Sequence, residues 1–170
     1  MAAANPFHPY FKTIVASYNY YMKPLIVLLS TFVVAIFAIR IISDNWNFPL
    51  AGTIAMSAML LFTSIAHFAF SKGMELMMPS FFPFKKQLVW LTGIIEMAAA
   101  AGLLLTSWKH TTALWLMVFF VLILPANIYA AAKKVDYQKA NHEGSGTSYL
   151  WFRVPLQILF IAWAYWFAYR

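Results

Sequence analysis

One carboxylate in the sequence lies where a charge is hard to accommodate. Glu96 is eight residues into an apolar run that begins near Leu88, which in a helix places it about 12 Å from that end. A carboxylate at such a depth must be protonated, paired with a cation or hydrogen-bonded. Glu96 is therefore either a structural clamp between helices or part of a functional site.

Four further polar residues accompany it, from three other apolar runs. They are His67, Asn127, Arg153 and Gln157. A chain that crosses a membrane five times brings all four to the depth of Glu96. We therefore expect one internal polar cluster with Arg153 as the counter-ion of Glu96, although His67 taken alone also fits an interfacial or core histidine.

The chemistry open to such a cluster is hydrogen bonding and proton exchange with a bound ligand, for which Glu96 and His67 are the suitable groups. One histidine and one carboxylate are too few for a metal site, since a catalytic zinc usually has three protein ligands. No Gly-rich phosphate loop, HExxH motif or nucleophile elbow occurs, so we assign neither catalytic nor metal-binding residues. With no cysteine in the chain, electrons would have to pass through a bound cofactor or a partner protein.

The composition is that of a membrane protein. Hydrophobic residues make up 63% of the chain and charged residues 10%, whereas a soluble domain has roughly 25% charged residues. The net charge of +7 does not indicate a nucleic-acid-binding protein, because Lys and Arg lie in short segments between apolar runs and form no continuous basic face.

Apolar runs about 20 residues long, enough to cross a bilayer core, recur along the chain. We predict an all-α, polytopic membrane helix bundle over residues 24–170, preceded by an interfacial arm over residues 1–23. The expected spans are 24–42, 49–70, 88–105, 112–132 and 150–169. Residues 71–87 should form an interfacial or re-entrant elbow and not a span. Pro125 should bend the fourth span, Pro155 should lie in the first turn of the fifth, and Gly102 should mark a close helix crossing.

Positive charge predicts the orientation. Nine of the twelve basic residues fall in the arm, the elbow, or the 133–148 loop and its flank, and three fall on the other side. The nine are Lys12, Lys23, Lys72, Lys85, Lys86, Lys133, Lys134, Lys139 and Arg153; the three are Arg40, Lys109 and Arg170. By the positive-inside rule the N-terminus should be cytoplasmic and the C-terminus periplasmic.

Several short motifs in register resemble those of the DoxX family of small bacterial membrane proteins, over roughly residues 50–168. They are Ala66-His67-Phe68, Met78-Pro79-x-x-x-Pro83, Leu88-Val89-x-x-Thr92-Gly93-x-x-Glu96, Gly102-Leu103-Leu104-Leu105, Pro125-Ala126-Asn127-Ile128-Tyr129, and Arg153-x-Pro155-Leu156-Gln157 with Trp163 and Trp166. The resemblance implies a four-helix core, to which the first span is an addition. It also implies a bacterial inner membrane location and a link to membrane redox or oxidative-stress systems, since the family takes its name from a relative in a thiosulfate:quinone oxidoreductase.

Three functions follow as expectations. The leading one is a component or accessory of a quinone-linked redox system, without its own redox centre, that holds a small lipophilic molecule at the polar cluster; the cofactor is unknown, with a quinone as one candidate. The alternative is a non-catalytic scaffold or chaperone for a partner membrane protein. A small-solute transporter ranks below both, because no internal repeat is visible. The expected partners are the lipid bilayer and either another membrane protein or a second copy of this chain.

Overall fold

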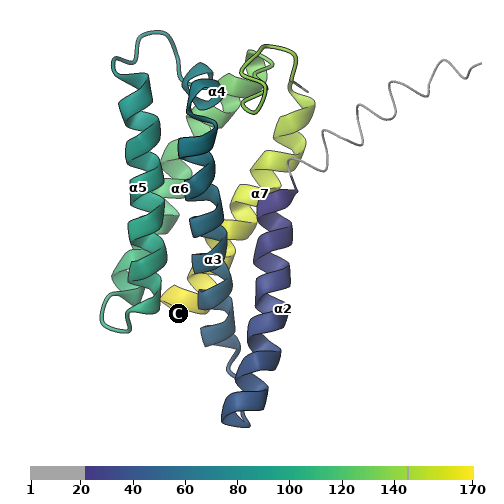
Figure 1. Ribbon diagram of the computed structural model, residues 1–170, viewed down its shortest axis with the longest axis vertical. Coiled ribbons are helices and arrows are strands. Elements are labelled where there is room, and N and C mark those ends of the chain that lie inside the picture. The colour runs from purple at the N-terminus through teal and green to yellow at the C-terminus, as the bar shows by residue number, and fades with distance from the viewer. Residues whose placement is uncertain (1–21, 145) are drawn as a thin grey trace, which may run out of the picture.

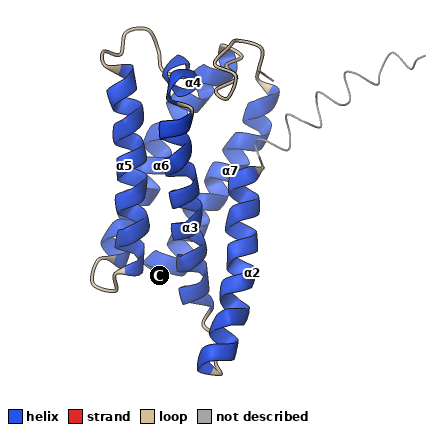
Figure 2. Ribbon diagram, viewed as in Figure 1, coloured by secondary structure: helices blue, strands red, loops and turns tan. Residues whose placement is uncertain are grey.

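The computed structural model describes residues 22–144 and 146–170, and this part of the chain is helical with no strand in it. The helices are α2 (Lys23–Ser43), α3 (Phe48–Ala69), α4 (Ser71–Leu76), α5 (Lys85–Leu104), α6 (Lys109–Ala132) and α7 (Ser148–Ala164), which continues as the π-helical turn η1 (Tyr165–Tyr169). Figure 2 shows that loops and turns connect these helices only at their ends. The all-α class predicted from the sequence is confirmed.

Five of these segments are long and apolar enough to cross a bilayer: α2, α3, α5, α6 and residues Leu150–Tyr169. Their outward faces are apolar as well. Val34 and Ile42 of α2 and Leu122 of α6, for example, are 68%, 85% and 70% exposed. Large apolar side chains in such numbers on the outside of a bundle are typical of lipid-facing helices. The structure is therefore that of a multi-pass membrane protein.

Helix α3 is the central element of the bundle: it packs on α2 and α5, while α6 packs on α7, η1 and α5. The core between them is built from Met56, Met59 and Leu60 of α3, Leu103 of α5, Leu116 of α6 and Leu156 of α7. Small residues let the helices come close. A β-carbon at Gly102 would lie 2.5 Å from Oγ1 of Thr112, so the expected close crossing at Gly102 is found, between α5 and α6.

Helix α2 is displaced along the bundle relative to α5 and α7, and begins beside the middle of the bundle in Figure 1. Its first residues, Lys23 and Pro24, consequently border the interior of the bundle and not its end. The arm predicted over residues 1–23 lies almost wholly outside the described residues.

Both prolines of the last two spans lie inside continuous helices. Pro125 lies inside α6, which continues to Ala132. Pro155 was predicted in the first turn of the last span, and this is wrong: α7 begins at Ser148, so that Pro155 is an interior residue. Residues 148–154 form helix ahead of Pro155, so this proline does not mark the start of the helix.

The segment predicted as an elbow covers one end of the bundle. Its helix α4 has only 6 residues, far too few to cross a membrane. Gly73 of α4 packs against the loop after α6, where a β-carbon would lie 1.7 Å from the carbonyl oxygen of Tyr137. Phe70 and Tyr137 add an edge-to-face ring contact at 6.2 Å between centroids. Helix α4 and this loop thus form a single cap, at the top of Figure 1.

Candidate functional site

A cavity of about 200 Å³ lies beneath the cap, among α3, α5, α6 and α7, and the first residues of α2, Lys23 and Pro24, also line it. Its walls are mostly apolar, with Met59, Phe62, Phe119 and Phe160 among them, and the cap contributes Met74 and Tyr137. All five polar residues predicted to cluster line this one cavity: His67, Glu96, Asn127, Arg153 and Gln157. The structure therefore brings them together, while their role in binding stays a prediction.

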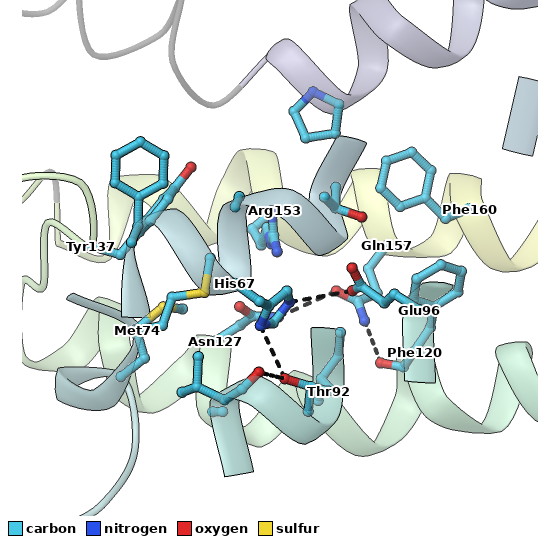
Figure 3. Close-up of a pocket in the computed structure, with 18 of the residues that line it drawn as sticks. His67, Met74, Thr92, Glu96, Phe120, Asn127, Tyr137, Arg153, Gln157 and Phe160 are labelled. Carbon is cyan, nitrogen blue, oxygen red and sulfur yellow. Dashed lines mark hydrogen bonds and ion pairs between the residues drawn. The ribbon is translucent and has the colours of Figure 1, made fainter. Parts of the chain in front are cut away.

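His67 of α3 is held on both sides by α5 (Figure 3). Its Nε2 lies 3.4 Å from Oε1 of Glu96, and its Nδ1 lies 3.0 Å from Oγ1 of Thr92. Thr92 and Glu96 are one helical turn apart, so a single face of α5 presents both partners. The imidazole is fixed in orientation by these two contacts.

The hydroxyl of Thr92 determines where the protons lie. This hydroxyl has one hydrogen, and it donates to the carbonyl oxygen of Val89 at 2.7 Å. Nδ1 of His67 must then carry a proton and donate it to Thr92. Nε2 then faces Oε1 of Glu96 at 3.4 Å, and a single proton on either the imidazole or the carboxyl group would join the two atoms. With that proton on either group, the pair has no net charge.

Asn127 and Gln157 form a second, separate set of contacts. Nδ2 of Asn127 donates to Oε1 of Gln157 at 3.4 Å, and Nε2 of Gln157 donates to the carbonyl oxygen of Phe120. Phe120 lies in α6 shortly before Pro125, which has no backbone N–H and so leaves one hydrogen bond of that turn unformed. Asn127 and Gln157 are 3% and 5% exposed, so these bonds join α6 to α7 in the interior.

Arg153 does not take the place predicted for it. Arg153 was predicted as the counter-ion of Glu96, coupled to it directly or through another residue of the cluster. The direct contact is not formed, since within residues 22–144 and 146–170 the basic group within 4.0 Å of Glu96 is His67. Arg153 precedes Gln157 by one turn of α7 and borders the same cavity, as Figure 3 shows. Its side chain is therefore not the direct partner of Glu96.

Sequence reasoning missed two contributors to the site. Thr92 was recognised only as a neighbour of Glu96 on the same face, although the Thr-x-x-x-Glu spacing could have predicted a shared partner. The cap residues Met74, Tyr137 and Gln138 come from segments that the sequence marks only as connections between helices. In the described part of the chain, no three metal-ligating side chains come together.

A comparison with protein families gives one match. Residues 56–168 fit the family of a domain of unknown function, DUF8561. This is more than half of the chain and includes the entire polar cluster, so the chain belongs to that family. No curated protein and no solved structure matches it.

Proposed function

We propose that this member of the DUF8561 family binds a small lipophilic molecule in the cavity under the cap. The observation that carries the proposal is the cavity itself, with apolar walls and a few convergent polar groups from four helices, an arrangement typical of small-molecule sites. Its volume of about 200 Å³ suits a head group of about one ring, since a cavity of roughly 150 Å³ accommodates benzene. A longer apolar tail would extend from the cavity towards the lipid.

The ligand class that we favour is a quinone, with the protein as a component or accessory of a quinone-linked redox system. Three features support this: the one-ring size of the cavity, the resemblance to the DoxX family, and the His67–Glu96 pair, in which an imidazole nitrogen lies 3.4 Å from a buried carboxylate oxygen. Proton exchange with a bound head group is what such a pair can provide. In this proposal a partner protein carries the electrons.

The proposed location is a bacterial inner membrane, with the cap on the cytoplasmic side. The support is the charge bias, because the cap and its flanks carry most of the basic residues. The cavity then lies in the inner half of the bilayer, within reach of molecules dissolved in that leaflet.

Native mass spectrometry of protein purified in nanodiscs tests the proposal. We expect a stoichiometric small molecule with the wild-type protein and its loss in Ala126→Leu, since Ala126 lines the cavity and a larger side chain would fill it. The matched control is Ala101→Leu, because Ala101 is exposed on α5 and should retain the molecule. A wild-type protein with an empty cavity would contradict the proposal.

One observation favours a second candidate, a scaffold or chaperone for a partner membrane protein. The bonds from Asn127 to Gln157 and from Gln157 to Phe120 lock two helices and need no ligand. In this case the same preparation should contain a stoichiometric partner protein and no small molecule, and Ala126→Leu should leave the partner bound.

A further inference from the structure

The two carboxylate oxygens of Glu96 have different surroundings. Oε1 faces Nε2 of His67 at 3.4 Å. Oε2 is buried and has no hydrogen-bond partner among residues 22–144 and 146–170. Figure 3 draws the contact between His67 and Glu96 as a dashed line inside the cavity. Glu96 is 5% exposed, so solvent outside the protein does not satisfy this oxygen.

The chemical character of Oε2 follows from the proton positions. With the Thr92 hydroxyl donating to Val89 and accepting from Nδ1 of His67, the contact between Nε2 and Oε1 takes a single proton on one of these two atoms. If the proton is on the imidazole, Oε2 belongs to a carboxylate; if it is on Oε1, Oε2 is a carbonyl oxygen. Oε2 is a hydrogen-bond acceptor in both cases. A buried acceptor without a donor is unfavourable, so the site lacks a donor.

The missing donor belongs in the cavity, because Glu96 lines it and none of the side-chain donors of the described residues reaches Oε2. Nε2 of Gln157 donates to Phe120, Nδ2 of Asn127 donates to Gln157, and Arg153, which also lines the cavity, does not donate to Oε2. The cavity is lined further by Met59, Phe120 and Phe160, whose side chains have no N–H or O–H group. A donor therefore has to arrive with the occupant.

We infer that the occupant of this cavity is an amphiphile whose head group carries a hydroxyl, and that this hydroxyl donates to Oε2 of Glu96. The inference rests on the proposed function, since it names the class of ligand for the same cavity. For a molecule that exists in two redox states, it assigns the cavity to the quinol, because both oxygens of a quinone only accept hydrogen bonds. The site would thus hold the reduced form in preference to the oxidised form.

A pair of probes that differ only in the donor tests the inference. A 4-alkylphenol and its methyl ether have the same ring and the same tail, and their affinities can be measured by calorimetry on the full chain in detergent. We expect the phenol to bind about 10- to 100-fold more tightly, as for a hydrogen bond to a charged or buried partner. Equal affinities would overturn the inference, with bound water as the donor to Oε2.

Two variants test whether Glu96 is the acceptor. In Glu96→Met the preference for the phenol should disappear while the ether still binds, since the size of the side chain is kept and its oxygens are lost. In Glu96→Gln the amide N–H₂ can donate to Nε2 of His67 and leave its oxygen towards the cavity, so a preference should persist. An unchanged preference in Glu96→Met would overturn the assignment to this residue.

The outcomes separate this inference from the proposed function. If phenol and ether bind equally and Ala126→Leu abolishes both, the cavity binds lipophilic molecules but has no role for a donor, and only the inference is wrong. If neither probe binds to the wild-type protein, both the inference and the proposed function are wrong.

Discussion

Gly93 of α5 lies directly against the β-carbon of His67 on α3. A β-carbon at position 93 would be 2.9 Å from Cβ of His67 and 3.1 Å from Cε2 of Phe68. Thr92 and Glu96, on either side of Gly93 in α5, are the two residues that hold the imidazole. The glycine therefore sets the distance between the helices at which these contacts form.

The first prediction is that Gly93→Ala disturbs the site. The added methyl group would force His67 away from α5 and lengthen the contact of 3.4 Å with Glu96. Overpacking costs about 1–3 kcal/mol, while alanine contributes only about 1 kcal/mol of helix propensity. We expect a net loss of thermal stability in detergent and weaker binding of the phenol probe.

The control for this prediction is Ala101→Ser, which adds one atom on an exposed face of the same helix and should change neither quantity. A Gly93→Ala protein that is more stable than the wild type and binds the probe normally would show that α3 and α5 have room to separate.

The second prediction concerns Gly102, where α5 crosses α6. Thr112 occupies the space that a side chain at position 102 would need, since its Oγ1 would be 2.5 Å from a β-carbon there. Gly102→Leu should lower the free energy of unfolding by about 1–3 kcal/mol or more by overfilling the crossing. Ala101→Leu, next to it and exposed, is the matched control in a thermal denaturation series. Equal melting temperatures for both variants would mean that the crossing is loosely packed.

Much of the fold could be predicted from the sequence because a membrane imposes simple rules. Apolar runs of about 20 residues must be helices when lipid surrounds them, and the five long segments lie within a few residues of the expected spans. The position of Pro155 in α7 could not be predicted in this way, because the helix begins at Ser148, seven residues before the proline. The displacement of α2 likewise depends on packing and not on hydropathy.

The members of the polar cluster could be predicted, but their pairing could not. Exposure of a polar side chain to lipid is unfavourable, so polar residues at one depth in neighbouring spans face one another. All five predicted residues line one cavity. Which side chains touch depends on distances of a few ångströms. Gln157 donates to the backbone of α6. Gly93 allows α3 to lie close to α5, so that His67, and not Arg153, contacts Glu96.

The third prediction is the topology. A reporter fused after Arg170 should be periplasmic, and one inserted between residues 140 and 147 should be cytoplasmic, because most Lys and Arg residues lie on the cap side. Alkaline phosphatase and green fluorescent protein are suitable reporters, because the two give their signals on opposite sides of the membrane. Two cytoplasmic signals would mean that one of the five long segments does not cross the membrane.

The fourth prediction is that Glu96 is coupled energetically to His67 more strongly than to Arg153. Glu96→Met leaves Nε2 of His67 without its partner, and His67→Leu leaves both carboxylate oxygens of Glu96 without one. Each should cost about 1–3 kcal/mol or more. The double variant replaces both by apolar groups, which is far milder than the loss of one partner, so it should be less unstable than the sum by about 1–3 kcal/mol.

The same cycle with Arg153→Met provides the comparison. Arg153 borders the cavity, but the ion pair of Glu96 is with His67, so the Glu96–Arg153 coupling should be well under that of Glu96 and His67. Both cycles can be measured by denaturation in mixed micelles. A larger coupling to Arg153 would mean that the charge of the guanidinium, and not the imidazole, holds the carboxylate in the bundle. If the Glu96→Met/His67→Leu protein is well folded and yet binds the phenol no more tightly than its methyl ether, the pair serves the ligand; if it keeps the wild-type preference for the phenol, the pair is a clamp between α3 and α5.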